Sequence, residues 1–233
     1  MILTLSIVTS ISLKEFNSIP VAVIIISASI FLPESNLIPS DSNSLIVSVT
    51  TEALLFLIEN AIKSGVSIVI DANWREIFWN YSNKSSPLQR IDHVLKIKKF
   101  FLNGDILKLS NEEAILFFEN DNPLLISQSL PKKPDVIITN GDKPISWLIN
   151  GIKGTTQILK SSKIVDTTGA GDSFLAGLVS RFLFRKEDAD KKCLNNHLQF
   201  ASTCGLISCL GQGAIEPQPN IEKVQDFLKS YGS

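Results

Sequence analysis

Several residue types and patterns are scarce in this chain of 233 residues, and each absence excludes a class of protein. Only three cysteines occur, Cys193, Cys204 and Cys209, and none forms a Cys-x-x-Cys pair; this argues against a zinc site and favours a cytoplasmic protein. The 22 Lys and Arg balance 23 Asp and Glu without a basic run, so we expect no nucleic-acid partner. The phosphate-binding pattern Gly-x-x-x-x-Gly-Lys-Ser/Thr is absent, which excludes P-loop NTPases.

The first 50 residues contain little charge, and no glycine precedes Gly65. Residues 19–32 are mainly apolar, but they are interrupted by Pro20 and fall short of the ~20 residues that a membrane helix needs. The first cation is Lys14, which does not fit a signal peptide, so we expect no membrane partner. Crowded β-branched residues predict a buried strand over 21–26, and a poorly formed segment is the alternative.

After residue 50, patterns typical of strands and helices alternate. Such alternation predicts an α/β fold with a mainly parallel sheet covered by helices on both faces. Ligands in these folds bind beyond the carboxyl ends of the strands, where Asp71, Ser110 and Asn140 are expected. The predicted strands are 66–70, 106–109 and 136–139, with a hairpin of 145–149 and 152–159 around an Asn-Gly turn; the predicted helices are 51–64, 87–100, one from Ser110, 171–184 and 193–210.

The most informative sequence is DTTGAGD at residues 166–172, which an apolar run follows. Gly169, Ala170 and Gly171 expose backbone N–H groups where a helix begins, and such a helix start binds anions. Asp172 lies in the first turn, where a carboxylate beside a bound phosphate can take a proton from an attacking hydroxyl. A glycine turn with a helix-start acid and no catalytic role is the structural alternative.

This segment resembles the C-terminal signature of the ribokinase-like (PfkB-type) carbohydrate kinases. Four further segments are similar to the same family, in the same order and spacing, over about residues 51–225. They are DANWREIFW at 71–79, as in the fructokinase group, KLSNEE at 108–113, TNGD at 139–142 and GQGA at 211–214 with Pro217.

The resemblance implies a ribokinase-like three-layer α/β/α fold and ATP-dependent phosphorylation of a sugar hydroxyl, with ATP and Mg²⁺ as cofactors. It implies an anion site at the glycine turn, Asp172 as the base, and roles for eight other residues. These are Thr139, Gly141, Thr168 and Gly213 at the nucleotide, Asn73 and Arg75 at substrate or phosphate, and Glu113 and Asp166 at metal ions, with Asp166 and Thr168 facing a monovalent cation such as K⁺.

Several of these residues also have purely structural alternatives. Ser110 and Glu113 have the spacing of a capping box, Thr139 can belong to a simple turn, and Arg75 can be a surface residue. Residues 1–50 match the family poorly, so 51–233 is expected to form the nucleotide-binding and catalytic domain. The family's Gly-Gly-Asn sugar turn is absent, so we expect the N-terminal part and the β lid to be missing or incomplete.

Three interpretations of function therefore stay open: a fructokinase-like sugar kinase, an inactive or regulatory nucleotide-binding fragment, and a nucleoside kinase of the same fold. The segment at 71–79 favours a sugar. The expected partner is a small sugar, and a homodimer is left open.

Overall fold

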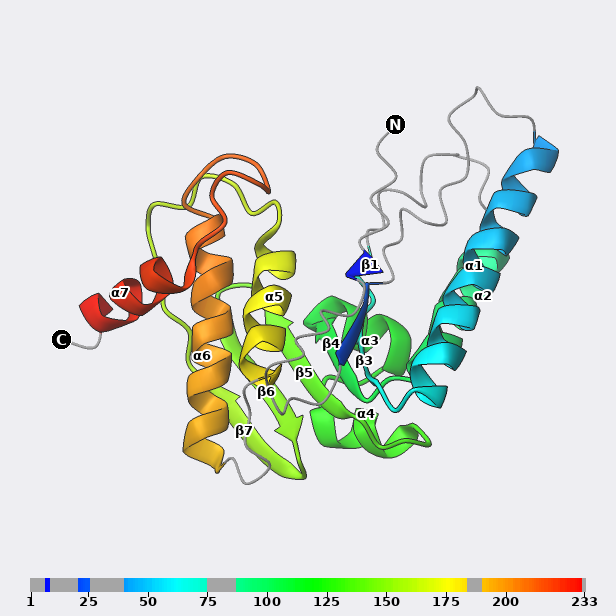
Figure 1. Cartoon of the computed structure of the whole chain (residues 1–233), viewed down its shortest axis with the longest axis horizontal. Coiled ribbons are helices and arrows are strands. Elements are labelled where there is room, and N and C mark those ends of the chain that lie inside the picture. The colour runs from blue at the N-terminus through cyan, green and yellow to red at the C-terminus, as the bar shows by residue number, and fades with distance from the viewer. Residues whose placement is uncertain (1–6, 9–20, 26–39, 75–86, 184–189, 232–233) are drawn as a thin grey trace. The chain divides into compact units, whose positions relative to one another are not determined.

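The computed structural model describes residues 7–8, 21–25, 40–74, 87–183 and 190–231, which fall into two compact units, Met1–Val136 and Ile137–Ser233 (Figure 1). The strands are β1 Ile7–Val8, β2 Val21–Ile25, β3 Ser67–Asp71, β4 Ile106–Ser110, β5 Asp135–Asn140, β6 Lys143–Ile149 and β7 Ile152–Thr156. The helices are α1 Ser40–Lys63, α2 Pro87–Phe101, α3 Asn111–Phe118, α4 Pro123–Ser129, α5 Ala170–Leu183, α6 Lys191–Ser208 and α7 Ile221–Tyr231.

The strands of the first unit pair mainly in parallel, as predicted. β2 runs parallel to β3 and β3 parallel to β4, whereas the short β1 is antiparallel to β2. β2 confirms the strand expected over 21–26, and β3 and β4 lie where the buried apolar runs predicted them. Asp71 and Ser110 are the last residues of β3 and β4, so the predicted carboxyl-end positions are confirmed for both.

Helix α1 differs from its prediction at both its start and its apolar face. It begins at Ser40 and not at Thr50 or Thr51, because threonine inside a helix costs little and apolar residues continue upstream. Leu54 and Ile58, four residues apart, are buried, but Leu57 and Ile62 of the predicted face are exposed. Over residues 52–63, where its side chains are described, the helix therefore buries a narrower apolar stripe than the sequence suggested.

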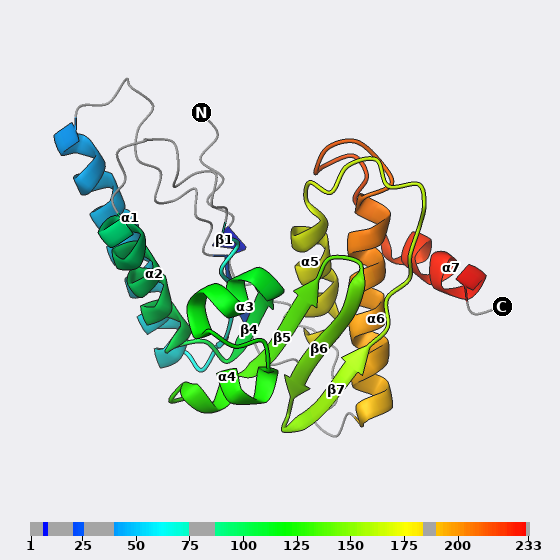
Figure 2. The same ribbon diagram turned by 180° about the vertical axis from the view of Figure 1, so that it is seen from behind.

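The second unit contains the predicted hairpin, which Figure 2 shows as β6 and β7 beside β5. Asn150 and Gly151 have φ of 51° and 73°, as expected for a two-residue turn of this composition. β7 ends at Thr156 and does not reach residue 159. Ile145 pairs with Thr156, so the next residue would face Pro144, which has no N–H to extend the ladder.

Trp147 is the centre of the hairpin's packing. Its ring is buried, and its Nε1–H donates to Thr156 Oγ1 at 2.9 Å; that hydroxyl donates to Asn195 Oδ1 of α6 at 2.8 Å. A Cβ on Gly154 would lie 2.0 Å from Trp147 Cζ2, so only glycine fits beside the ring. These contacts fix the hairpin to α6.

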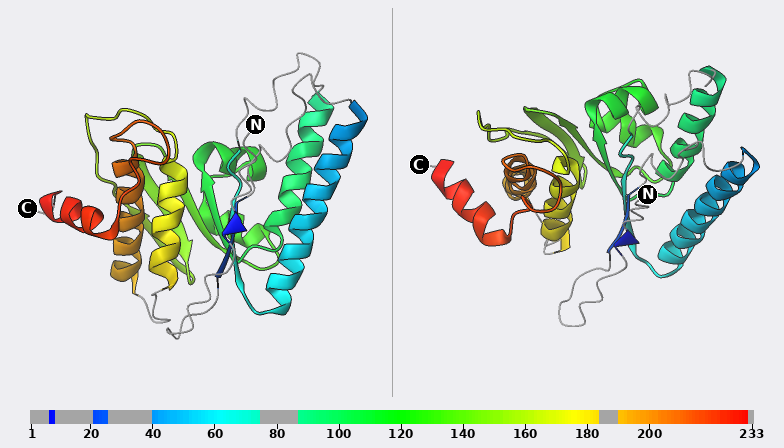
Figure 3. Two further views of the ribbon diagram at one scale, coloured as in Figure 1. Left: turned by 45° about the horizontal axis from the view of Figure 1, so that its top comes forward. Right: turned by 90° about the horizontal axis from the view of Figure 1, so that it is seen from above.

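Helices α5 and α6 lie together on one face of β5, β6 and β7 (Figure 3). Their close approach depends on small residues, as the sequence of α6 predicted. A Cβ on Gly177 would lie 2.8 Å from Cys204 Sγ, and one on Gly205 would lie 3.0 Å from the carbonyl oxygen of Ala170. α6 therefore supports the first turn of α5 directly.

The cysteines are free, and two of them are buried between packed elements. Burial raises the pKa of the Cys204 thiol to about 11, so this side chain stays protonated and packs as an apolar group. Among the described residues, no group of three or more His, Cys, Asp or Glu side chains is placed to hold a metal ion. None of the helices in that part of the chain is long and apolar enough to cross a membrane.

Candidate active site

The glycine turn leads into α5 in the second unit, where the sequence placed it. Gly169 has φ +80°, which other residues adopt only with strain, and it precedes the first helical residue, Ala170. Asp172 lies in the first turn of α5 and is exposed. The N–H of Ala170, predicted to face an anion, donates instead to the carbonyl of Thr167 at 3.2 Å. Gly171 lies in the same first turn, and binding of an anion by its N–H stays a prediction.

Asp166 organises this turn with both carboxylate oxygens. Oδ1 accepts the N–H of Thr168 at 2.9 Å and its hydroxyl at 2.7 Å, and Oδ2 accepts the N–H of Gly213 at 2.9 Å. The Thr168 N–H, its hydroxyl and the Gly213 N–H together lower the pKa of Asp166, so it remains a carboxylate at neutral pH. Asp166 thus joins the glycine turn to the loop after α6.

That loop, residues 211–218, is fastened to the start of α5 at further points. Ala214 lies against Gly169, and Ser173 Oγ is hydrogen-bonded to Gln218 Oε1. Gln218 Nε2 in turn donates to the carbonyl of Ala214 at 2.8 Å. The turn's backbone is therefore held from outside the turn, and a bound anion would meet a preformed surface.

The predicted nucleotide residues Thr139 and Gly141 lie at the end of β5. Thr139 is half-buried, Asn140 ends the strand, and Gly141 is exposed with φ +54°. This confirms the predicted strand end, whereas the contact of these residues with a nucleotide remains a prediction.

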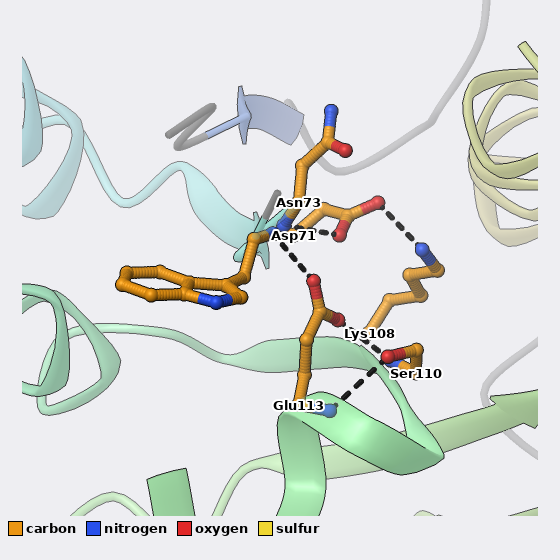
Figure 4. Close-up of polar contacts among 6 residues, drawn as sticks. Asp71, Asn73, Lys108, Ser110 and Glu113 are labelled. Atoms are coloured by element: carbon orange, nitrogen blue, oxygen red, sulfur yellow. Dashed lines mark hydrogen bonds and ion pairs between the residues drawn. The ribbon is translucent and has the colours of Figure 1, made fainter. Parts of the chain in front are cut away.

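A second polar cluster lies in the first unit, at the carboxyl ends of β3 and β4 (Figure 4). Glu113 is 5 % exposed, and each of its oxygens accepts a backbone N–H: Oε1 from Trp74 at 2.6 Å and Oε2 from Ser110 at 2.7 Å. Ser110 Oγ accepts the N–H of Glu113 at 3.1 Å, which completes the predicted capping box. Glu113 therefore joins the start of α3 to the segment that follows β3.

The environment of Glu113 is electrostatically unusual. Burial raises the pKa of its carboxyl above the usual range, and the negative charge of Asp71 raises it further. Lys108 and the two backbone N–H groups act in the opposite direction. A carboxylate offers about four acceptor sites, so two remain after the backbone bonds are made.

Asn73 stands beside this carboxylate, with its backbone in the left-handed region at φ 42°. Its N–H donates to Asp71 Oδ1 at 3.1 Å, and its side chain is directed away from the cluster (Figure 4). Arg75, the other residue predicted to meet substrate or phosphate, lies outside the described residues.

Sequence reasoning did not single out Lys108 as a functional residue. Its Nζ lies 2.9 Å from Asp71 Oδ2, and the lysine is 7 % exposed. The available signal was a single charged residue inside an apolar strand, Ile106–Ser110, because a buried lysine is rare without a partner.

Each unit contains a feature that, taken by itself, suits part of the binding of a nucleotide with Mg²⁺: the glycine turn suits a phosphate, and Glu113 suits a hydrated Mg²⁺. Gly169, at φ +80°, directly precedes the first residue of α5, and a glycine turn that begins a helix in this way accommodates an anion. Mg²⁺ bound with a nucleotide typically keeps waters and takes one or two carboxylates plus phosphate oxygens. A single buried carboxylate such as Glu113 fits that pattern.

Comparison with known proteins decides the family. Residues 33–221 match the family described as pfkB family carbohydrate kinase. The chain belongs to the pfkB family of carbohydrate kinases. This confirms the resemblance drawn from the five sequence segments.

Individual pfkB relatives are similar over most of this chain. It is 28 % identical to "Probable fructokinase-6, chloroplastic" of Arabidopsis thaliana, over 80 % of this chain and 48 % of that protein. The fructokinase of Xylella fastidiosa with bound ATP is similar with a TM-score of 0.65 and 22 % identity, over 81 % of this chain and 58 % of the other. The Vibrio cholerae fructokinase with fructose, ADP and calcium is similar with a TM-score of 0.63 and 22 % identity, over 88 % of this chain and 59 % of the other.

These likenesses confirm the predicted ribokinase-like α/β fold of the pfkB chain. The chain spans about half the length of each of these relatives. The division at residue 50 stays a prediction, although the family match begins at residue 33 and α1 runs across residue 50.

Gly169→Ala should destabilise this pfkB chain more than glycine-to-alanine exchange at another position of positive φ. A left-handed backbone costs alanine about 1–2 kcal/mol, and the new Cβ would also meet Ala214 at 2.9 Å. Gly151→Ala is the matched control, because Gly151 has φ +73° in the same unit and no atom within 4 Å of an added Cβ. Urea unfolding measures both, and equal losses would show that Ala214 does not constrain the turn.

Proposed function

We propose that this chain catalyses transfer of the γ-phosphoryl group of ATP to a hydroxyl group of a sugar, with fructose as the first candidate. The observation that carries the proposal is the glycine turn held by Asp166 and the 211–218 loop at the start of α5, with Asp172 in the first helical turn. Family membership and the fructokinase relatives support it.

In this reaction the sugar oxygen bonds to the γ-phosphorus as the bond from that phosphorus to the β,γ-bridging oxygen breaks, and ADP leaves with the electron pair. The hydroxyl proton passes to the carboxylate of Asp172, which acts as the general base. Backbone N–H groups of Gly169 and Gly171, at the positive end of the α5 dipole, stabilise the charge on the phosphoryl oxygens.

The remaining residues bind and orient the nucleotide, the substrate and the ions. Thr139, Gly141 and Gly213 are assigned to the nucleotide, and Asn73 and Arg75 to substrate or phosphate. Glu113 would hold the waters of Mg²⁺ through its two remaining acceptor sites, and the bound ion would neutralise phosphate charge. Asp166 and Thr168 are assigned to a monovalent cation, in addition to the bonds that hold the turn.

Calorimetric titration of the full chain with ATP and Mg²⁺, followed by assay of ADP formation with and without fructose, tests the proposal. We expect a dissociation constant of about 1 mM or lower, the usual range for enzyme substrates, and ADP formation that requires the sugar. Binding without sugar-dependent ADP formation would indicate a nucleotide-binding fragment and contradict the proposed transfer. Absence of binding would contradict the nucleotide assignment as well.

A further inference from the structure

Asp71 and Lys108 form a buried ion pair between neighbouring strands. They are register partners of the parallel pair β3 and β4, and Lys108 Nζ lies 2.9 Å from Asp71 Oδ2. Asp71 is 1 % exposed and Lys108 7 %. Figure 4 shows the lysine side chain extending toward the aspartate at the strand ends.

Stability alone does not explain such a pair. Removing two charges from water has a large cost, and well-packed apolar side chains of similar volume often replace a buried pair without loss. The strands around this pair are rich in such apolar residues, including the buried Ile70, Leu107 and Leu109. The pair is better explained by its effect on the segment that follows β3.

The pair holds the segment that follows β3. While Oδ2 of Asp71 faces Lys108, Oδ1 accepts the N–H of Asn73 at 3.1 Å. The next N–H, that of Trp74, donates to Glu113 Oε1 at 2.6 Å. Two successive backbone amides are thus fixed by two different carboxylates, and Asn73 keeps its left-handed conformation at φ 42° between them.

Lys108 also balances the charge of this cluster. Asp71 and Glu113 are both buried; burial raises the pKa of Glu113, the negative charge of Asp71 raises it further, and Lys108 lowers it. Lys108 thus offsets negative charge at both side chains. Without the lysine, Asp71 would lose this ion-pair partner, and repulsion between Asp71 and Glu113 would favour displacement of one carboxylate from the backbone N–H that it accepts.

We propose that Lys108 is a positioning residue for phosphoryl transfer: it holds Asp71, which fixes the backbone of Asn73 and so directs the Asn73 side chain. The proposal rests on the function proposed above, because Asn73 is there assigned to substrate or phosphate. Lys108 acts through Asp71 and the turn.

Lys108→Met tests this role, and Lys132→Met is the matched control. Lys132 pairs with Asp105 at the same 2.9 Å in the same unit, but on the surface, with the two side chains 35 % and 39 % exposed. We expect Lys108→Met to speed hydrogen exchange of the Asn73 and Trp74 amides, followed by NMR, at least about ten-fold. The kcat should fall about ten- to hundred-fold, because a small displacement of a group that orients the substrate has a cost of that size. The KM for ATP should change little. Lys132→Met should change neither the amide exchange rates nor kcat.

The double variant Lys108→Met with Asp71→Asn shows whether the lysine acts through Asp71. The amide oxygen introduced at position 71 still accepts the Asn73 N–H, and the aspartate charge that the lysine paired is removed together with the lysine. We expect recovery of about ten-fold or more of the lost turnover, a coupling typical of residues in contact. If Lys108→Met alone fails to fold, Lys108→Gln takes its place; because its amide keeps a donor for Asp71, we expect changes in the same direction but smaller, still absent from Lys132→Met.

Two results would overturn the proposal. In the first, exchange at 73 and 74 in Lys108→Met equals that in Lys132→Met. In the second, turnover does not recover in the double variant, which would mean that the lysine acts independently of Asp71. If the unmodified chain forms no ADP with any sugar, the proposed function fails, and the exchange comparison still decides whether Lys108 holds the turn.

Discussion

Asp172→Asn should lower sugar-dependent ADP formation by about 10²–10⁴-fold, the usual cost of losing a general base, while ATP affinity changes only a few-fold. Asparagine has nearly the same shape as aspartate, so the first turn of α5 should persist. Its amide does not take up the hydroxyl proton as a carboxylate does. Removing a negative charge near the phosphates also relieves repulsion, which would favour ATP binding slightly.

Asp226→Asn is the matched control for this prediction. Asp226 is an exposed carboxylate on α7 in the same unit, paired with Lys229 at 3.2 Å on the surface, where such pairs contribute little. ADP formation with fructose and calorimetric ATP titration are measured for both variants. If Asp172→Asn keeps most of its turnover, the residue only begins a helix. If ATP affinity collapses as well, Asp172 holds the turn, and the role of base is unsupported.

Local patterns made much of the fold predictable. Ser110 and Glu113 stand three residues apart, so their capping box was visible in the sequence, and the structure contains both of its bonds. The Asn150 and Gly151 turn was equally local. Helix α7 carried a similar signal that was missed: Asn220 Oδ1 accepts the N–H of Lys223, as a cap does. Such features depend on neighbours within a few residues.

Contacts between distant parts of the chain were not predictable in the same way. Asp71 and Lys108 meet only because β3 and β4 pair in one register, and the sequence does not state the register of two strands 37 residues apart. The bond from the Trp74 N–H to Glu113 likewise depends on where β3 ends relative to α3. The sequence therefore identified Glu113 by its family pattern and cap, but not the turn that it also holds.

The two interpretations of Glu113, helix cap and Mg²⁺ residue, make separable predictions. Glu113→Gln should lower the free energy of unfolding by about 1–3 kcal/mol, the cost of leaving a buried donor unsatisfied. The reason is geometric: Trp74 and Ser110 donate to different carboxylate oxygens, and glutamine has only one oxygen, so its NH₂ group would face one of the two N–H donors. Urea unfolding without Mg²⁺ measures this loss, and Glu112→Gln, an exposed neighbour on α3, should cause none.

Ser110→Ala then separates the cap from the metal role. It removes the hydroxyl that accepts the Glu113 N–H and should cost about 0.5–2 kcal/mol of stability, but it leaves the carboxylate and both of its bonds in place. If the carboxylate orders the waters of Mg²⁺, Glu113→Gln should raise the Mg²⁺ concentration needed for half-maximal ADP formation, and Ser110→Ala should not. Equal Mg²⁺ dependence in both variants would make Glu113 a structural residue only. A raised Mg²⁺ requirement in Glu113→Gln alone would mean that one carboxylate serves both roles, since its two backbone bonds leave two acceptor sites for the hydrated ion.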